Sequence, residues 1–561
     1  MSARVSSIWL ALLVGVAVGR VAAAADAAIA SAHPLATAAG VEILNAGGNA
    51  FDAAVAVSAA LAVVEPYSSG LGGGGFWLLH EAGGREVMID GREKAPLAAR
   101  ADLYLDARGK VVPRASIDGP LAAGIPGEPA ALAHIARRYG RLSLARSLAP
   151  AIRLAEQGFP ADPVYRRMAR WRRDLLARYP DSAAVFLRDG QVPPEGARIR
   201  QPALARTLKR LAREGRDGFY RGPLAREMVR AVRAAGGIWR LEDLAAYRVV
   251  ERRPVEGRFL GWKITSASLP SSGGIVLVEM LNMLEAAGWA GRPPLQRLTL
   301  MIEAMRRAYR DRAEYLGDSD FTPVPVARLL SKAHARASIA DYDPDHASPS
   351  RPLPPVDGNG ADTTHFSIVD AEGNRVAATL SINYPFGSGF VAGDSGVLLN
   401  DEMDDFSAKP GVPNVYGLVG SRANAIAPGK RMLSSMSPTF VETPDGVAVL
   451  GTPGGSRIIT MLLQAILAMR DSRDPAEWVS RPRIHHQYLP DEVQLEPGAL
   501  DETQQAALRQ RGYHLKPEAR RWGNMQAISL DRAGHARAAS DPRGIGVSRV
   551  IATGAKDARF Q

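Results

Sequence analysis

A threonine at the start of a predicted strand, deep inside the chain, carries the clearest chemical signal in this sequence. Thr363 opens residues 363–369, where β-branched and aromatic residues predict a β-strand. A threonine hydroxyl is a poor nucleophile unless a base stands beside it, and the threonine's own α-amine can be that base once the preceding peptide bond is cut. Such an amine has a pKa of about 7.7–8.0, so it is partly neutral near pH 7. The sequence thus predicts a precursor that forms its active site by cutting itself before Thr363.

The segment that precedes this threonine is suited to a chain break. Residues 341–362 are rich in Pro, Ser, Asp and Gly, a composition typical of exposed and flexible loops. Asp362 stands immediately before the expected scissile bond, and its carboxylate can either assist or oppose the cleavage.

Polar residues after the nucleophile are spaced so that the fold can bring them to it. Strands at 364–369 and 376–382 flank a turn and predict a hairpin, so Asn383 is expected at the sheet edge where Thr363 begins. Glu402 and Asp405, at i and i+3, can face one another across a helical turn.

A second hairpin, 439–443 with 447–451, supplies further candidates at its ends. Ser434 and Ser435 stand just before its first strand, and Gly454-Gly455 lie between its second strand and a helix that begins near Ser456. Backbone N–H groups at a helix start have no partner within the helix. Two of them aimed at one point form an oxyanion hole, where losing one donor costs about 10²–10³ in rate.

The elements that must position these residues follow from periodicity and capping. A helix is expected from His33 to Gly47-Gly48, and Asn49 caps a second helix, apolar on all sides, that reaches Val64. Strands are expected at 76–80 and 87–90, and roughly 120–340 is mostly helical. An all-apolar helix belongs between other layers, so helix–sheet–helix layering is predicted from both ends of the chain.

Composition bounds the class of protein. At 561 residues the chain exceeds the range of a single core, and it contains no cysteine, which excludes thiol catalysis, disulfides and cysteine-ligated zinc. The net charge of +11 comes largely from arginine clusters such as 166–173 and 209–213. Trp171 is the one aromatic residue interleaved with these two clusters, which is thin support for a nucleic-acid site, so solvated helix faces are favoured. An anionic small substrate remains compatible with this charge.

The N-terminus has the pattern of a secretory signal peptide. A short basic start is followed by an apolar run at 8–18 and by small residues at 22–25. That run is too short to favour a membrane span. We expect residues 1–25 to be removed and the protein to be exported, either to the periplasm or into the medium.

Three local patterns suggest other chemistry and are rejected on context. Residues 393–396 copy the tetrapeptide around the nucleophile of chymotrypsin-like proteases, but that class is all-β. The glycine run 72–75 is not followed by the Lys-Ser/Thr of a phosphate loop, so a close-packed turn beside the pocket is expected. His485-His486 lacks the i,i+4 spacing of a zinc motif, so it is read as packing or loop anchoring and no metal is predicted.

Taken together, the motifs resemble one known family over nearly the whole mature chain: the gamma-glutamyltransferases (glutathione hydrolases), which are N-terminal-nucleophile enzymes. The matching blocks are GGNAFDAA (47–54), LGGGGF (71–76), GREKAP (91–96), PSSGG (270–274), TTH (363–365), LNDEMDDF (399–406), LSSMSPT (433–439) and GTPGGSR (451–457).

The resemblance implies an α/β fold, a four-layer αββα N-terminal-nucleophile hydrolase sandwich. It also implies self-cleavage between Asp362 and Thr363 into a large subunit, 26–362, and a small catalytic subunit, 363–561. Thr363 would attack the γ-amide of glutathione or a related compound, and the resulting γ-glutamyl ester would be resolved by water or by an amino acid or dipeptide. No cofactor is implied, and the partners are these small molecules and the two subunits themselves.

The resemblance also assigns roles to individual residues. The substrate α-carboxylate would be held by Arg92, Ser434 and Ser435, and its α-ammonium by Asn383, Glu402 and Asp405. Gly454 and Gly455 would hold the oxyanion. Residues 409–417 resemble a lid whose Tyr416 closes over the glutamyl group. Ser381 stands where many members have a threonine that supports the nucleophile's amine, so function with less rigid positioning is expected. A zwitterionic headgroup independently requires a cationic fork and a carboxylate, and Arg92 suits the first need.

Two rival functions stay open at this stage. A same-fold acylase for glutaryl β-lactams or γ-polyglutamate would not require the ammonium pocket. A non-enzymatic periplasmic protein that binds amino acids or peptides would remain uncut and bind glutamate without turnover. The balance of hydrolysis and transfer, the physiological donor and the oligomeric state are not determined by the sequence.

Overall fold

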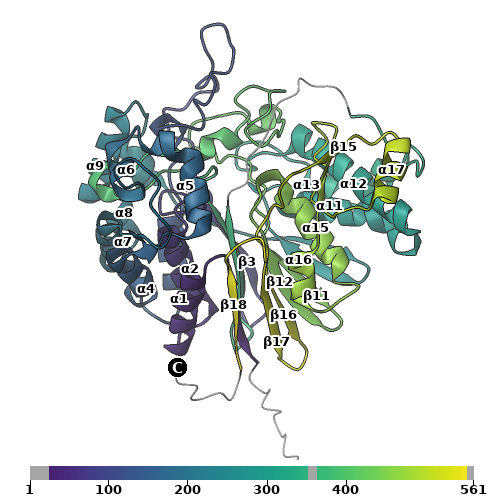
Figure 1. Cartoon of the computed structure of the whole chain (residues 1–561), viewed down its shortest axis with the longest axis horizontal. Coiled ribbons are helices and arrows are strands. Elements are labelled where there is room, and N and C mark those ends of the chain that lie inside the picture. The colour runs from purple at the N-terminus through teal and green to yellow at the C-terminus, as the bar shows by residue number, and fades with distance from the viewer. Residues whose placement is uncertain (1–24, 351–362, 553–561) are drawn as a thin grey trace, which may run out of the picture.

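The structure, a computed structural model, describes residues 25–350 and 363–552. Residues 1–24 of the expected signal peptide and Asp362 therefore lie outside the described residues. Two β-sheets stack face to face in the centre of the molecule, and helices cover the outer face of each (Figure 1). This arrangement is the predicted αββα sandwich.

The first sheet has seven strands in the order β18-β1-β9-β10-β2-β3-β6, all antiparallel to their neighbours. The predicted hairpin after Thr363 is confirmed, since β9 and β10 pair side by side at its centre. The strand bounds are β1 Ala27–Ser31, β2 Gly74–His80, β3 Glu86–Gly91, β6 Val250–Arg252, β9 Thr364–Val369, β10 Arg375–Ser381 and β18 Val547–Ile551.

The second sheet has six strands in the order β17-β16-β12-β11-β8-β7, and its centre contains the predicted second hairpin. Its strands are β7 Val255–Phe259, β8 Trp262–Ser266, β11 Thr439–Thr443, β12 Gly446–Gly451, β16 Gln526–Asp531 and β17 Ala536–Ser540. Short strands outside the two sheets are β4 Phe159–Pro160, β5 Arg198–Ile199, β13 Ile484–His485, β14 Val493–Leu495 and β15 Leu515–Pro517.

Helices α1 (Pro34–Asn45) and α2 (Ala50–Val64) cover the first sheet, as predicted. Asn49 caps α2 in a reciprocal capping box with Asp52, and every residue of α2 is buried. More helices surround this pair: α3 Glu128–Arg138, α4 Leu144–Gln157, α5 Pro163–Leu176, α6 Pro180–Phe186, α7 Pro202–Glu214, α8 Arg216–Tyr220, α9 Gly222–Ala234 and α10 Leu241–Ala246.

The second sheet is covered from the other side, on the right of Figure 1. Its helices are α11 Gly273–Ala286, α12 Pro294–Tyr315, α13 Val326–Leu329, α14 Lys332–Ile339, α15 Ile458–Ala468, α16 Pro475–Ser480 and α17 Glu502–Gln510. Six 3₁₀ turns complete the fold: η1 Pro120–Ala122, η2 Trp289–Gly291, η3 Gly393–Ser395, η4 Glu402–Asp405, η5 Arg422–Asn424 and η6 Gly455–Arg457.

Side chains alternate between two cores along the strands of the first sheet. On β2, Trp77 and Leu79 pack into the core shared with α1 and α2, whereas Phe76 and Leu78 pack into the core shared with the second sheet. Because strand side chains point to opposite faces in turn, a strand buried on both faces is apolar throughout. Residues 76–79 of β2 are apolar on both faces because the strand lies between these two cores.

One expectation about the middle of the chain is confirmed and another needs correction. Residues 120–340 are mostly helical, as predicted, and the short strands β6, β7 and β8 within them complete both sheets. The arginine cluster on α5, however, is not wholly solvated. Arg172 is buried and donates to the carbonyls of Pro385 and Gly387, so it serves as an interior anchor.

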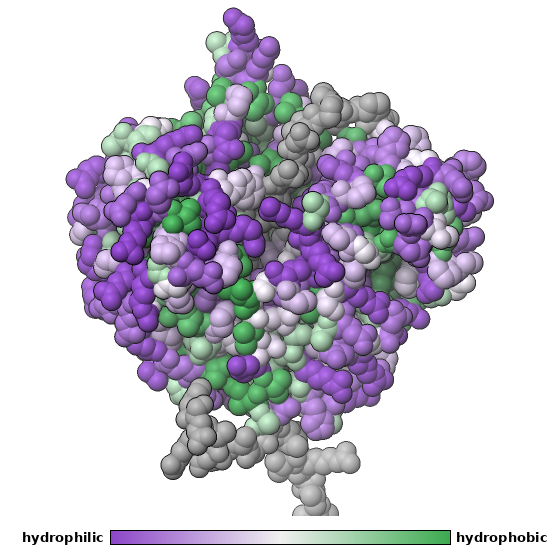
Figure 2. All heavy atoms as spheres, viewed as in Figure 1, coloured by the Kyte–Doolittle hydropathy of each residue, from purple (hydrophilic) through white to green (hydrophobic). Residues whose placement is uncertain are grey.

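The other arginines of the clusters 166–173 and 209–213 are exposed or half-buried, which fits the expected surface role. Hydrophilic residues prevail on the face seen in Figure 2. Within residues 25–350 and 363–552, no helix combines the length and apolar character needed to cross a bilayer.

Candidate active site

Most of the predicted site residues line one small pocket. Its free volume is about 20 Å³, which is room for a single water molecule and not for a glutamyl group. The lining consists of Arg92, Thr363, Ser381, Asn383, Glu402, Asp405, Tyr416, Leu418, Ser434, Ser435, Met436, Gly455, Ser456 and Ile458. Of the predicted residues, Gly454 only adjoins this lining and Asp362 is outside the described residues.

Thr363 is buried at the start of the central hairpin, and Ser381 at the end of β10 faces it. The two hydroxyl oxygens, Thr363 Oγ1 and Ser381 Oγ, are 3.4 Å apart. Ser381 Oγ also accepts the N–H of Asn383 at 2.8 Å. The glycine run packs directly behind, since a Cβ at Gly73 would lie 2.2 Å from the Ser381 carbonyl oxygen. This confirms the predicted close-packed turn beside the pocket.

The residue after the nucleophile is anchored to the end of α2. Thr364 Oγ1 donates to Glu65 Oε2 at 2.7 Å, and Tyr67 donates to the other oxygen of Glu65. Burial raises the pKa of Glu65, although His33 and Thr364 oppose the shift. The first strand after the predicted cleavage point is therefore bonded to the buried helix on which its sheet rests.

Arg92 is fully buried just after β3 and makes two ion pairs with the 3₁₀ turn η4. Its Nη1 lies 2.5 Å from Glu402 Oε2, and its Nη2 lies 2.5 Å from Asp405 Oδ2. The predicted i,i+3 arrangement of Glu402 and Asp405 is thus present, and it presents both carboxylates to one guanidinium. The fork expected for the carboxylate and the acids expected for the ammonium are bonded to each other.

A further acid, Glu93, stands behind this cluster. Its Oε2 is 3.4 Å from Arg92 Nη1, and its Oε1 has no hydrogen-bond partner among the described residues. Burial and the Glu402 carboxylate raise the pKa of Glu93 well above its ordinary value, and burial likewise raises the pKa of Glu402. Glu93 therefore packs as a third carboxyl group against a guanidinium that already pairs with two carboxylates.

The two serines approach the pocket from the opposite side. Ser435 Oγ accepts a hydrogen bond from Arg312 Nη2 at 3.1 Å, and the Ser434 carbonyl accepts from Ser272 Oγ at 2.7 Å. Arg312 Nε in turn donates to Ser272 Oγ at 3.0 Å. The predicted PSSGG block therefore supports the serines from behind, a role that the order of motifs could not reveal.

Gly454 and Gly455 form the turn between β12 and η6. Their φ angles are +140° and +56°, values that favour glycine. No acceptor for the N–H of either residue is found in residues 25–350 and 363–552. The turn therefore offers backbone donors beside Thr363, as an oxyanion hole requires.

The predicted lid lies over the pocket in a closed position. Tyr416 Oη donates to the Asn383 carbonyl at 3.0 Å, and its ring packs against Gly455, where a Cβ would lie 2.5 Å from Tyr416 Cδ1. Asp404 Oδ2 accepts the N–H of Val415 at 3.0 Å, which ties the lid to η4. Tyr416 of the predicted lid therefore contacts both the residue that ends the first hairpin and the Gly454-Gly455 turn.

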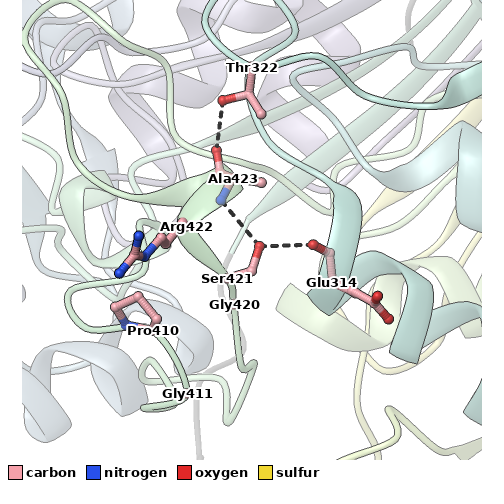
Figure 3. Close-up of a pocket in the computed structure, with 8 residues that line it drawn as sticks. All are labelled: Glu314, Thr322, Pro410, Gly411, Gly420, Ser421, Arg422 and Ala423. Atoms are coloured by element: carbon pink, nitrogen blue, oxygen red, sulfur yellow. Dashed lines mark hydrogen bonds between the residues drawn. The ribbon is translucent and has the colours of Figure 1, made fainter.

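A larger and more open pocket of about 750 Å³ lies on the outer side of the lid (Figure 3). It contains none of the predicted site residues. Ser421 Oγ donates there to the Glu314 carbonyl at 2.9 Å, and Thr322 Oγ1 donates to the Ala423 carbonyl at 3.4 Å. These bonds join residues 421–423, which follow the predicted lid, to the end of α12 and to Thr322 beyond it.

Side chains that could bind metal lie away from the site. Two groups in the described part of the chain have suitable spacing, His80–Glu86–Glu442 and Glu279–Asp311–His334. His485 and His486 are buried and bonded to neighbouring side chains, as predicted for loop-anchoring residues. Ser395 of the protease-like tetrapeptide is also buried, and it donates to the Ala392 carbonyl.

Comparisons with known proteins agree with this geometry. The family model described as gamma-glutamyltranspeptidase matches residues 36–551. The glutathione hydrolase proenzyme of Escherichia coli (strain K12) is 43% identical over 528 residues, which are 92% of this chain and 90% of that protein. The acylase ACY 1 proenzyme of Pseudomonas sp. (strain SE83) is 37% identical, with 93% of each chain covered. Among solved structures, cephalosporin acylase from Bacillus halodurans superposes with a TM-score of 0.81 at 28% identity, covering 94% of this chain and 96% of that one.

Proposed function

Since the chain belongs to the gamma-glutamyltranspeptidase family, we propose that it is a self-processing glutathione hydrolase and γ-glutamyltransferase. One observation gives this proposal its strongest support. The buried Thr363 shares its pocket with an ion-pair cluster of the buried Arg92 and Glu402 with the partly buried Asp405, which suits a ligand that carries both an ammonium and a carboxylate.

The reaction requires only protein groups. The neutral α-amine of Thr363 accepts the hydroxyl proton while Oγ1 attacks the γ-carbonyl of the substrate. The N–H groups of Gly454 and Gly455 stabilise the oxyanion that forms. The tetrahedral intermediate collapses, the C–N bond breaks, and the α-ammonium returns its proton to the leaving amine. Water or an acceptor amine then attacks the γ-glutamyl ester by the same route and restores the threonine.

The headgroup is held by exchange of partners inside the charged cluster. The α-ammonium takes Asn383, Glu402 and Asp405 as acceptors. The α-carboxylate takes donors from Arg92, Ser434 and Ser435. Arg92, Glu402 and Asp405 already form one ion-pair network, and the zwitterion inserts its own charges into it. The cost of removing water from these three protein groups has therefore been met largely during folding and not during binding.

Maturation and export complete the proposal. Residues 1–25 act as a signal peptide, and the mature enzyme consists of subunits 26–362 and 363–561 made by cleavage after Asp362. The family likeness to proenzymes supports the processing, and the N-terminal pattern supports export to the periplasm or beyond the cell.

An acylase for glutaryl amides is the second candidate, because acylases are among the relatives and the structural neighbours. The acids Glu402 and Asp405 make the acylase function less suitable, since a glutaryl group has no ammonium to pair with them. A γ-glutamyl anilide and a glutaryl anilide therefore separate the two functions. Turnover of the glutaryl compound alone would select the acylase.

The decisive experiment measures intact mass, N-terminal sequence and γ-glutamyl-p-nitroanilide turnover for the wild type beside Thr363→Ala. The proposal expects two wild-type fragments, one beginning at Thr363, with activity, and an uncut inactive variant. An uncut wild type that binds glutamate without turnover would instead identify a binding protein. Arg92→Ala tests the headgroup assignment, which fails if kcat/KM stays at the wild-type level.

A further inference from the structure

Arg312 of α12 is a buried cation. Among the described residues, its side chain donates hydrogen bonds to two serine hydroxyl groups and to no carboxylate. Of the eight buried arginines in the described residues, it alone has no carboxylate within 4.0 Å. Arg306 and Arg307 on the same helix both pair with Glu303. A guanidinium keeps its charge in proteins, and an uncompensated buried charge is costly. Its hydrogen bonds to Ser272 and Ser435 are therefore the contacts from which a role for this charge can be argued.

The other side of Ser435 faces the headgroup cluster. Arg92 pairs there with two carboxylates, Glu402 and Asp405, and a third carboxyl group, Glu93, lies 3.4 Å from its Nη1. The acidic groups of the cluster therefore outnumber its one guanidinium. Ser435, which Arg312 contacts, lines the same pocket as this cluster, so Arg312 is a second cation beside the headgroup site.

The link between Arg312 and the pocket is the hydroxyl of Ser435. Since Ser435 Oγ accepts from Arg312 Nη2 at 3.1 Å, its own hydrogen is directed elsewhere. No acceptor for that hydrogen is found in the described residues, and Ser435 lines the pocket. A hydroxyl polarised by a cation behind it is a stronger donor, and the ligand group that it fits is an anion.

Resting on the proposed function, we propose that Arg312 is a positioning residue that orients and polarises Ser435 toward the substrate α-carboxylate. It thereby sets the preference for acyl donors that carry this carboxylate. Arg312 does not line the pocket and acts only through Ser435, with Ser272 holding its Nε at 3.0 Å.

The test compares two anilides that differ only in the group concerned. γ-Glutamyl-p-nitroanilide has the α-carboxylate, and 4-aminobutyryl-p-nitroanilide has the same amine and chain without it. Arg312→Gln is expected to lower kcat/KM for the first about tenfold or more, mainly through KM, and to leave the second within about threefold, because only the first substrate carries the anion that Ser435 is proposed to bind. Arg312→Lys, which keeps the charge, should be intermediate.

Competitive inhibition by L-glutamate and by 4-aminobutyrate provides the same comparison without turnover. Only L-glutamate should weaken in Arg312→Gln. The matched control is Arg310→Gln on the same helix, whose side chain is 47% exposed. Intact mass confirms that each variant is processed, and if Arg312→Gln is not, Arg312→Lys decides.

Equal loss with both substrates would overturn the inference, because a merely structural residue affects them alike. No loss with either would overturn it as well. Failure of the proposed function is distinguishable, since it appears as a wild type that does not turn over the γ-glutamyl anilide.

Discussion

Ser381 connects the nucleophile with the headgroup site through one hydroxyl. Its Oγ lies 3.4 Å from Thr363 Oγ1 and accepts the N–H of Asn383, whose φ is +74°. The hydroxyl therefore orders both the attacking residue and the backbone that carries an ammonium ligand. The missing methyl group, relative to threonine, removes packing and leaves these bonds.

We predict that Ser381→Ala lowers kcat about tenfold, because the lost hydrogen bonds are worth about 1 kcal/mol or more. Ser381→Thr should retain wild-type kcat, since it keeps the oxygen. Steady-state kinetics on fully processed protein provide the measurement. A Ser381→Ala enzyme with unchanged kcat would show that the hydroxyl is dispensable.

Asp404 makes stability depend on pH through its place beneath the lid. Burial raises its pKa to about 6, although hydrogen bonds from Ser116 and Val415 oppose the shift. The folded protein thus binds this proton more tightly than the unfolded chain. The resulting stabilisation is fully present below the unfolded pKa of about 3.9 and is lost as the pH rises through the folded value.

The Tm of the wild type relative to Asp404→Asn is therefore expected to be highest near about pH 4 and to fall by a few degrees toward about pH 7. Thermal scans of both proteins across this range measure the difference. The exposed Asp174→Asn serves as a control for the amide substitution itself. A flat or rising difference would contradict the assignment of this pKa.

At the scale of elements, the lid closes through one aromatic residue. Tyr416 bonds to the Asn383 carbonyl and packs on Gly455, so it links the hairpin, the oxyanion turn and the loop 409–417. Tyr416→Phe loses one hydrogen bond and should raise KM for a γ-glutamyl anilide about two- to tenfold. Tyr416→Ala also loses the ring contact and should raise KM further. Equal KM values in all three proteins would mean that the lid does not cover the substrate.

The junction of α2 with β9 positions the predicted cleavage point. Glu65 follows the last residue of α2 and accepts a hydrogen bond from Thr364, which adjoins the nucleophile. We predict that Thr364→Val and Glu65→Gln both slow self-cleavage, with a double variant no slower than the worse single one, because one bond is lost in each case. Time courses of precursor loss on denaturing gels measure this. Additive slowing would show that the two residues act independently.

At the scale of the whole molecule, the two predicted subunits interleave in both sheets. In the order β18-β1-β9-β10-β2-β3-β6, strands from after Thr363 pair on both sides with strands from before it. In the second sheet, β11 pairs with β8 across the same division. Each cut piece would leave open sheet edges and exposed core if it separated.

The fragments of the processed protein should therefore co-elute as one species in native size-exclusion chromatography and separate only in denaturant. Mass spectrometry of the native and the denatured peak measures this. The uncut Thr363→Ala precursor should elute at the same volume. Free small fragment under native conditions would contradict the interleaved arrangement.

Arg92, Ser381 and Tyr416 were assigned to the site only by the family resemblance. Local sequence was enough to predict the hairpins, the capped and wholly apolar α2, and the approach of Asn383, the Glu402/Asp405 pair, Ser434-Ser435 and Gly454-Gly455 to Thr363. Such features depend on neighbouring residues, whose periodicity, caps and turn types are visible along the chain. The predicted layering followed because an all-apolar helix can be buried only between other elements. The strands inside the helical middle were missed because short strands carry too little periodic signal.

The sequence by itself determined the order of the elements and the residue types available to the site, and it predicts Thr363 as the nucleophile. Only the tertiary structure decided how these residues pair. It joins Arg92 to Glu402 and Asp405, removes Arg172 from solvent, and sets the unpaired Arg312 behind Ser435. The physical reason is that burial and charge balance depend on groups far apart in the chain. Whether a charge costs or contributes stability is therefore settled only when the layers have come together.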